Sequence, residues 1–167
     1  FICTSGKAAE LYTETLLPNV AAGLEAAGRS DAGYDRMIEV KVSFDTDRQR
    51  ALEDTKHWAA LALTPEEKMS VEDPAEMERL ADALPLERAA KRWIVSNDAE
   101  EHVERIKYYV DLGFRNLVFH APGPDQERFL RLYAEQVLPR LRARFGWFAR
   151  AWLVGLLALD ADGAGGR

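Results

Sequence analysis

Several features that often mark a function are scarce in this sequence. Cysteine occurs once, as Cys3, so the chain can form neither a disulfide framework nor a cysteine-based zinc site. We therefore expect a reducing, cytoplasmic environment. The three histidines are far apart and lack metal-ligand spacing, so we expect no metal site. No apolar run reaches the ~20 residues that a membrane-spanning helix needs, so we expect no membrane partner.

Positive charge is also in short supply. Lysine and arginine number 22 against 28 aspartate and glutamate residues, which gives a net charge of −6. A protein that binds nucleic acid needs a basic face, so this balance argues against a nucleic-acid partner. The apolar share of 47% is ordinary for a globular protein, and 167 residues correspond to one domain or to part of a larger one.

Strand and helix patterns alternate along the chain. Strands are predicted at 1–4, 37–44 and 116–120, with a short apolar run at 93–95 as a candidate fourth, and helices at 7–27, 47–61, 98–112 and 125–144. We expect Pro18 to kink or break the first helix and Asn97 to cap the third. Strands that alternate with helices predict an α/β fold with a parallel sheet.

Three convincing strands are too few for a complete fold of this kind. A (β/α)8 TIM barrel needs eight strand–helix units and ~250 residues. Phe1 and Ile2 already lie inside an apolar strand pattern. We therefore predict that residues 1–145 are the C-terminal portion of a (β/α)8 barrel whose N-terminal half is missing from the sequence. On its own, such a fragment is expected to self-associate and to lack enzymatic activity, because its sheet edges and the rest of its site are uncovered.

Two segments interrupt the regular alternation. Residues 64–92 contain two helix starts, at Thr64-Pro65 and at Asp73-Pro74, and are predicted to be a helical insertion before the last strand–helix unit. Residues 146–167 shift to alanine, leucine, glycine and tryptophan. We expect this tail to be disordered or a spurious extension, with an added helix packed on the barrel as the alternative.

The sequence blocks resemble a known family. The segment IVSNDAEEHVERIKYYVDLGFRNLVFHAPG is similar to the C-terminal signature of the luciferase-like flavin and deazaflavin oxidoreductases, which are (β/α)8 barrels. Four further blocks narrow the resemblance to the coenzyme F-420-dependent glucose-6-phosphate dehydrogenases of actinobacteria. These blocks are FICTSGKAAELYTETLLP, DRMIEVKVSFD, LALTPEEKMSVEDPAEMERLADALPLERAAKRWIV and LVFHAPGPDQERFL. The resemblance covers roughly residues 1–145, and the tail departs from it.

The resemblance implies a set of site residues. It places the substrate-phosphate pocket at Thr4 and Lys7 in TSGK, Lys68 in TPEEK and Arg92 in AKRW. It implies that coenzyme F-420 and glucose 6-phosphate are the ligands, that the full-length protein is a homodimer, and that the catalytic residues lie in the N-terminal half. The chemistry agrees, because a sugar phosphate carries nearly two negative charges at pH 7 and two lysines with an arginine can neutralise it.

Five other polar residues carry a less specific signal. We interpret His57 and His102 as structural or solvated. His120 ends a strand on the expected ligand side, and a place in the active site is its alternative to a structural role. Glu39 and Lys41 alternate with apolar residues in one strand, and we interpret them as interior charges paired with neighbours.

Three functions remain open from the sequence. The first is oxidation of glucose 6-phosphate to 6-phosphogluconolactone with hydride transfer to F-420, in which this chain supplies the phosphate pocket. The second is a related F-420-dependent oxidoreductase that acts on another alcohol or sugar. The third is a truncated product with no catalytic role.

Overall fold

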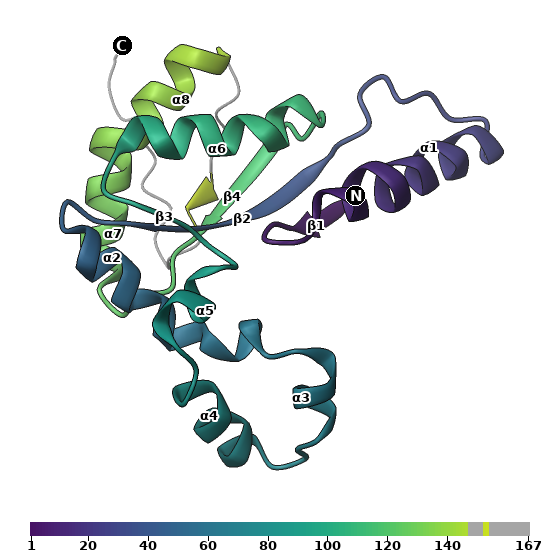
Figure 1. Cartoon of the computed structure of the whole chain (residues 1–167). Helices are drawn as coiled ribbons and strands as arrows, with labels where there is room; N and C mark the ends of the chain where they lie inside the picture. The colour runs from purple at the N-terminus through teal and green to yellow at the C-terminus, as the bar shows by residue number, and fades with distance from the viewer. Residues whose placement is uncertain (147–151, 154–167) are drawn as a thin grey trace, which may run out of the picture.

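The computed structural model describes residues 1–146 and the backbone of residues 152–153 (Figure 1). The strands are β1 (Ile2–Thr4), β2 (Met37–Phe44), β3 (Ile94–Ser96), β4 (Asn116–His120) and β5 (Trp152–Leu153). The α-helices are α1 (Leu17–Ala26), α2 (Arg48–Asp54), α3 (Pro65–Met69), α4 (Pro74–Asp82), α5 (Leu86–Ala90), α6 (Ala99–Asp111), α7 (Gln126–Leu132) and α8 (Leu138–Phe145). Two π-helical segments, η1 (Leu11–Leu16) and η3 (Tyr133–Val137), and one 3-10 segment, η2 (Thr55–Ala62), complete the described elements.

The strands form a parallel sheet, which confirms the predicted α/β class. Along the sheet the order is β1-β2-β4-β5, and β3 pairs with the last three residues of β2. The register places Thr4 opposite Glu39 and Lys41 opposite His120. Strand β5 was not predicted, and the remainder of the tail beyond Gly146 lies outside the described residues.

Strand β2 lies between β1 and β4 in the sheet, and its two faces differ in polarity. Ile38, Val40 and Val42 are fully buried, and β-branched side chains suit a pleated strand that is covered on that face. The intervening residues Glu39 and Lys41 point to the opposite face, since successive side chains alternate along a strand. The helices thus cover an apolar face, and a polar face is left on the other side of the sheet.

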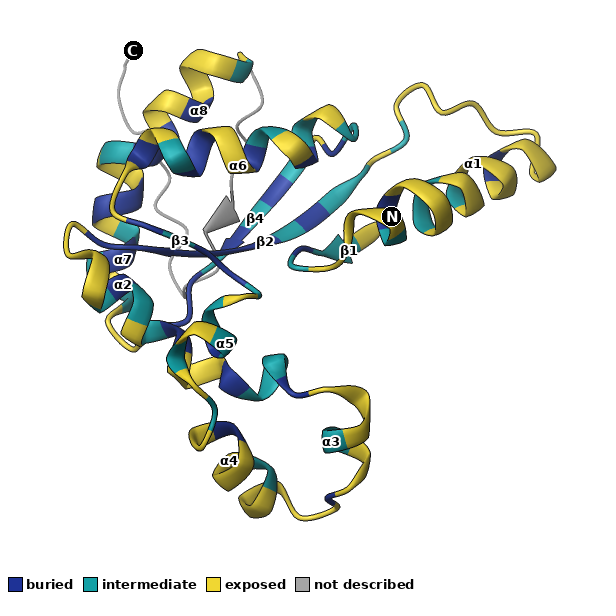
Figure 2. Ribbon diagram, viewed as in Figure 1, coloured by how far each residue is buried: buried dark blue, intermediate teal, exposed yellow. Residues whose placement is uncertain are grey.

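The main hydrophobic core lies between the apolar face of the sheet and the helices α6, α7 and α8. Figure 1 shows α6 and α8 running together on one side of the sheet, and Figure 2 shows that their buried residues alternate with exposed ones. Phe119 of β4, Ile106 of α6 and Tyr133 of η3 are all fully buried there. Amphipathic helices on a parallel sheet bury one face each, which is the arrangement that barrel units share.

The first helix continues through Pro18, where a kink or break was predicted. The chain widens into the π-helical η1 just before α1, and the Leu17 N–H donates to the carbonyl of Tyr12, five residues back. Proline has no N–H to donate, and a π turn is one of the adjustments that accommodates such a gap. Pro18 then occupies the first turn of α1, where its missing N–H costs little.

Three local predictions need correction. The predicted helix at 47–61 is split into α2 and η2, and Trp58 has non-helical angles inside η2. Residues 64–92 contain three short helices, α3, α4 and α5, and not two. The cap of α6 is Asp98, whose side chain accepts from the Glu100 N–H at 2.8 Å, and not Asn97. The Asp98 N–H donates to Ser96 Oγ, which fixes this start one residue later than predicted.

The helical excursion formed by η2, α3, α4 and α5 has a hydrophobic cluster of its own. Ala59, Leu63, Ala81 and Ala89 are buried against each other, away from the main core. Thr64 and Glu67 form a reciprocal capping box at the start of α3. Figure 1 shows the excursion extending away from the sheet, with α3 apart from β1.

His102 of α6 is buried, so the structural interpretation of this residue is confirmed and the solvated one is wrong. Its ring contacts the rings of Phe44 and Tyr133 edge-on, at centroid distances of 5.1 and 5.7 Å. Within the described residues, Nε2 is buried without a hydrogen-bond partner. Burial, and then the nearby Arg105, lower the pKa of His102 to about 4.

This pKa predicts a loss of stability in acid. The unfolded chain binds a proton at His102 below a pKa of 6.5, whereas the folded chain does so only near about 4. The stabilisation is therefore complete above pH 6.5 and is lost as the pH falls toward 4. We expect the free energy of unfolding to fall by roughly 2–3 kcal/mol between pH 7 and pH 4.5 from this residue, because each pKa unit is worth about 1.4 kcal/mol.

Urea unfolding of the chain at both pH values measures this loss. His102→Phe keeps a ring against Phe44 and Tyr133 but cannot titrate, so its unfolding free energy should change less with pH. Equal pH dependence in the two chains would show that His102 does not carry the acid sensitivity.

Candidate anion-binding site

The turn that follows β1 holds two of the predicted site residues. Thr4 is the last residue of β1, and Lys7 is exposed three residues later. Ser5 extends the pairing beyond the strand, because its N–H donates to the Glu39 carbonyl at 2.8 Å and its Oγ accepts from the Lys41 N–H at 2.7 Å. Gly6 then adopts a φ of +71°, which turns the chain toward η1. The turn from Thr4 to Lys7 is therefore anchored to β2.

Arg92 reaches this same turn through its backbone. A Cβ added at Gly6 would lie 2.5 Å from the Arg92 carbonyl oxygen, so the two backbones are in direct contact. Only glycine allows that approach and tolerates the positive φ. The contact joins the end of the helical excursion to the end of β1. It brings the segment that carries Arg92 to the carboxyl end of the sheet, where Lys7 lies.

The side chain of Arg92 has hydrogen-bonding capacity to spare. In the described part of the chain, its Nε is buried without a hydrogen-bond partner, and so is Nε1 of the adjacent Trp93. Buried donors are normally satisfied, and an unsatisfied one calls for an explanation such as a ligand. An acceptor-rich group such as a phosphate fits an arginine with free donors.

Lys68 lies elsewhere in the structure. It belongs to the last turn of α3, in the helical excursion, and Figure 1 shows this helix apart from β1. The structure thus brings together the segments of Thr4, Lys7 and Arg92, and it leaves Lys68 on a separate helix.

The polar face of the sheet carries an ion-paired cluster beside the turn. Lys41 Nζ and His120 Nδ1 each lie 3.0 Å from Glu39 Oε1. Burial alone would raise the pKa of Glu39, but the hydrogen bonds from Lys41 and His120 outweigh it and lower the pKa below its usual value. A carboxylate only accepts, so Nδ1 of His120 carries the hydrogen in this pair. The predicted pairing of Glu39 and Lys41 is confirmed.

Two tryptophans from the excursion and its end pack on His120. Its ring centroid lies 4.7 Å from that of Trp58 and 5.2 Å from that of Trp93, both edge-on. This contact was missed in the sequence, since Trp58 lies within the excursion, Trp93 follows it, and no local motif links either residue to His120. The cluster ties β4, β2 and the excursion together at the carboxyl ends of the strands, where barrel enzymes place their sites.

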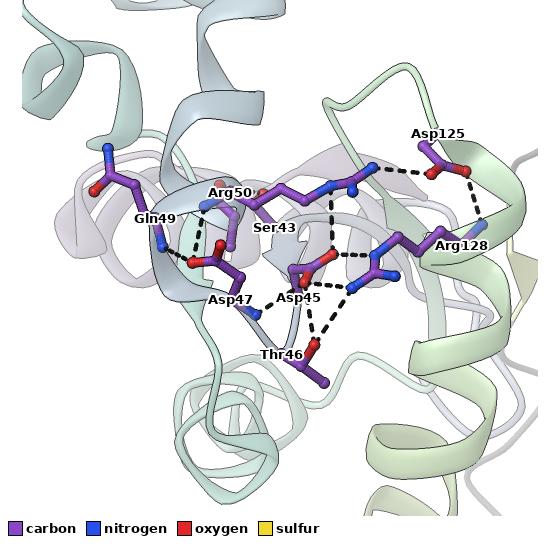
Figure 3. A network of polar contacts seen from close by, with 9 residues as sticks. Ser43, Asp45, Thr46, Asp47, Gln49, Arg50, Asp125 and Arg128 are labelled. Carbon is purple, nitrogen blue, oxygen red and sulfur yellow. Dashed lines mark hydrogen bonds and ion pairs between the residues drawn. The ribbon is translucent and has the colours of Figure 1, made fainter.

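A second polar network lies at the end of β2, between α2 and the start of α7 (Figure 3). Asp45 accepts two hydrogen bonds from Arg128, at 2.6 Å from Nε and 2.9 Å from Nη2. The guanidinium of Arg128 lowers the pKa of Asp45 to about 2. Arg50 bridges Asp45 and Asp125, with its Nη2 at 2.9 Å from the Asp125 carboxylate. This network joins the loop after β2 to the start of α7 and is structural in character.

Neither a group of metal-ligating side chains nor a membrane-spanning helix is found in the described part of the chain. Within residues 1–146, no three His, Cys, Asp or Glu side chains are grouped so as to hold a metal ion. In the same part of the chain, none of the helices has the length and hydropathy that crossing a bilayer requires. His57 is exposed on η2.

Comparisons with known proteins place the chain among oxidoreductase relatives. The F420-dependent glucose-6-phosphate dehydrogenases of Nakamurella multipartita and Beutenbergia cavernae are each 66% identical to it, over 146 and 144 residues. These matches cover 87% and 86% of the chain and 43% of each relative. The chain therefore spans less than half the length of these curated relatives.

Two solved structures share the fold. An F420-dependent secondary alcohol dehydrogenase in complex with an F420-acetone adduct superposes with a TM-score of 0.67 at 22% identity, over 84% of this chain and 42% of that one. The EDTA monooxygenase from Chelativorans sp. BNC1 superposes with a TM-score of 0.52 at 14% identity, over 86% of this chain and 42% of that one. At these identities the likeness shows the fold alone, which agrees with the expected α/β fold of a partial barrel.

A family profile gives the assignment. The profile of the luciferase-like monooxygenases matches residues 1–116, which is well over half of the chain. The matched region contains β1, the turn with Lys7, the helical excursion and α6. The chain belongs to the luciferase-like monooxygenase family.

Proposed function

We propose that the chain is the C-terminal part of a coenzyme F-420-dependent glucose-6-phosphate dehydrogenase. The two 66%-identical relatives of that name support the proposal. In the complete protein, the C1 hemiacetal of glucose 6-phosphate would be oxidised to 6-phosphogluconolactone, with the hydride passing to the deazaflavin coenzyme. A general base outside this chain would take the hydroxyl proton.

In this proposal the chain itself binds the phosphate of the substrate. The observation that carries it is the backbone contact of Gly6 with Arg92, which brings Arg92 to the turn of Thr4 and Lys7. The phosphate would accept from the Thr4 hydroxyl, from Lys7 and from the guanidinium of Arg92. Its position fixes the reacting carbon of the sugar relative to the rest of the barrel, which is how a remote group contributes to catalysis.

Lys68 would close this phosphate site from the excursion. Its helix α3 carries no other residue of the proposed site, and Lys68 lies in the last turn of that helix. A lysine ammonium on a long flexible stem suits a group that has to reach a doubly charged anion from a separate element. We propose that α3 approaches the turn after β1 when the phosphate is bound.

We assign no residue of this chain to the coenzyme, whose part in the reaction is to accept the hydride. On the family resemblance, we propose a homodimer in the cytoplasm for the full-length protein.

Loss of a phosphate-binding cation should weaken the reaction with glucose 6-phosphate and leave the reaction with free glucose nearly unchanged. The chain is co-expressed with the amino-terminal part of the Nakamurella multipartita relative, and reduction of F-420 is followed with both sugars. A hydrogen bond to a charged group is worth about 1.5–3 kcal/mol, and 1.4 kcal/mol is about tenfold in binding. Arg92→Ala or Lys68→Ala should therefore raise KM for glucose 6-phosphate by roughly ten- to a hundredfold. The slower reaction with free glucose should hardly change.

Arg79→Ala is the matched control, because Arg79 is an exposed cation of α4 in the same excursion. It changes the net charge equally and should leave both sugars unaffected. Equal losses on the two sugars in the Arg92 or Lys68 variant would contradict the phosphate assignment. Absence of F-420 reduction with either sugar in the unmodified pair would instead favour a product without catalytic role.

A further inference from the structure

A buried tyrosine hydroxyl holds the start of the proposed phosphate-binding turn. Tyr12 of η1 is fully buried, and its hydroxyl donates to the Thr4 carbonyl at 2.7 Å. Burial, and then the neighbouring Tyr109, raise the pKa of this hydroxyl. The hydroxyl of Tyr12 therefore fixes the residue that begins the turn.

A second tyrosine holds the middle of the turn. The Gly6 N–H donates to the hydroxyl of Tyr109, a residue of α6, at 3.4 Å. The rings of Tyr12 and Tyr109 meet edge-on, with centroids 6.0 Å apart and an interplanar angle of 78°. Each ring thus supports the other, and the pair reaches the turn from the helix side of the sheet.

The two hydroxyls complete a set of contacts on three sides of the turn. Ser5 attaches it to β2, the backbone of Arg92 packs on Gly6, and the tyrosines hold it from the helices. A turn without these contacts would have to be ordered by the ligand, and that ordering would reduce the affinity. Neither tyrosine needs to touch the phosphate for this effect.

We propose that Tyr12 and Tyr109 are positioning residues for the anion site, which hold the Thr4–Lys7 turn in its binding geometry against Arg92. This inference rests on the proposed function, since it presumes that the turn binds the phosphate of a sugar phosphate. It assigns to η1 and α6 a role that lies outside the four residues of the pocket itself.

The test removes the hydroxyls and keeps the rings. The complete 167-residue chain is titrated with inorganic phosphate, and the shift of the Gly6 and Lys7 amide resonances gives the affinity. A neutral hydrogen bond corresponds to about a threefold to tenfold change in an equilibrium constant, so Tyr12→Phe and Tyr109→Phe should each weaken binding by about that factor. The longer contact of Tyr109 should give the smaller effect.

Tyr108→Phe is the matched control. Tyr108 neighbours both rings edge-on, at 6.4 Å from Tyr12 and 5.2 Å from Tyr109. No hydrogen bond of its hydroxyl to a described residue is present, so this variant should bind phosphate as the unmodified chain does. Circular dichroism verifies that all three variants retain their helices, which separates a local effect on the turn from unfolding.

Two results would overturn the inference, and they differ. If the unmodified chain binds phosphate and both variants bind it equally well, the tyrosines do not position the turn, and the proposed function stands. If the unmodified chain shows no amide shift with phosphate up to ~100 mM, which is about 100-fold above a millimolar Kd, the anion site fails and the inference fails with it.

Discussion

Gly6→Ala should destabilise the chain and abolish phosphate binding at the turn. A left-handed conformation costs a residue with a Cβ about 1–2 kcal/mol. At Gly6 that Cβ would also lie 2.5 Å from the Arg92 carbonyl oxygen and 3.2 Å from its carbonyl carbon. Both neighbours are backbone atoms and cannot turn aside, so overpacking adds about 1–3 kcal/mol. We expect a total loss of about 2–5 kcal/mol in unfolding free energy, measured by urea denaturation.

Gly28→Ala separates the two contributions. Gly28 has a similar φ of +61°, but a Cβ there would meet no atom within 4 Å. This variant should lose only the conformational part, about 1–2 kcal/mol, and should keep its phosphate affinity. If the two variants were equally stable and bound phosphate alike, the contact of Gly6 with Arg92 would have no energetic weight.

Asp45→Ala should be the most destabilising change among the ion pairs. The side chain of Asp45 is 4% exposed, and it accepts two hydrogen bonds from Arg128 while it also faces Arg50. A hydrogen bond to a charged group contributes about 1.5–3 kcal/mol, and this variant loses the two from Arg128. Because the Arg128 side chain is 30% exposed, water can solvate its charge in the variant, and we expect a loss of about 2–3 kcal/mol.

Glu104→Ala provides the comparison for Asp45. Glu104 pairs with Arg144 at 2.7 Å, and both side chains are about half exposed. Exposed pairs of this kind contribute at most about 1 kcal/mol, so the variant should unfold close to the unmodified chain. Thermal and urea unfolding of the two variants are measured in parallel at pH 7. If both variants lost the same unfolding free energy, the stabilising role of the Asp45 ion pairs would be contradicted.

The sheet and the long helices could be predicted because their signals are local. The alternation of Ile38, Val40 and Val42 with polar residues marks β2, and Gly113, with its φ of +87°, follows the end of α6, where glycine is common. Short elements were less predictable. Asn97 and Asp98 are both good capping residues, and the choice between them depends on Ser96, whose hydroxyl accepts from the Asp98 N–H.

The candidate site was predictable only in part, because its contacts are distant in sequence. The family resemblance indicated Thr4, Lys7, Lys68 and Arg92, and these four remain proposals. No sequence pattern indicates that the Arg92 carbonyl lies against Gly6, more than eighty residues earlier. The edge-on contacts of Trp58 and Trp93 with His120 were hidden for the same reason, since aromatic residues near a helix end are usually read as core.

The separate cluster of the helical excursion has a consequence for hydrogen exchange. Three of its four buried residues, Ala59, Ala81 and Ala89, are alanines, so the cluster buries little apolar area compared with the main core. Such a unit can open while the sheet stays folded, and its amides then exchange with solvent before those of β2. If Lys68 helps to bind an anion, only molecules in which α3 to α5 are folded against each other can bind it fully. The apparent affinity for the anion is then reduced in proportion to the fraction of such molecules.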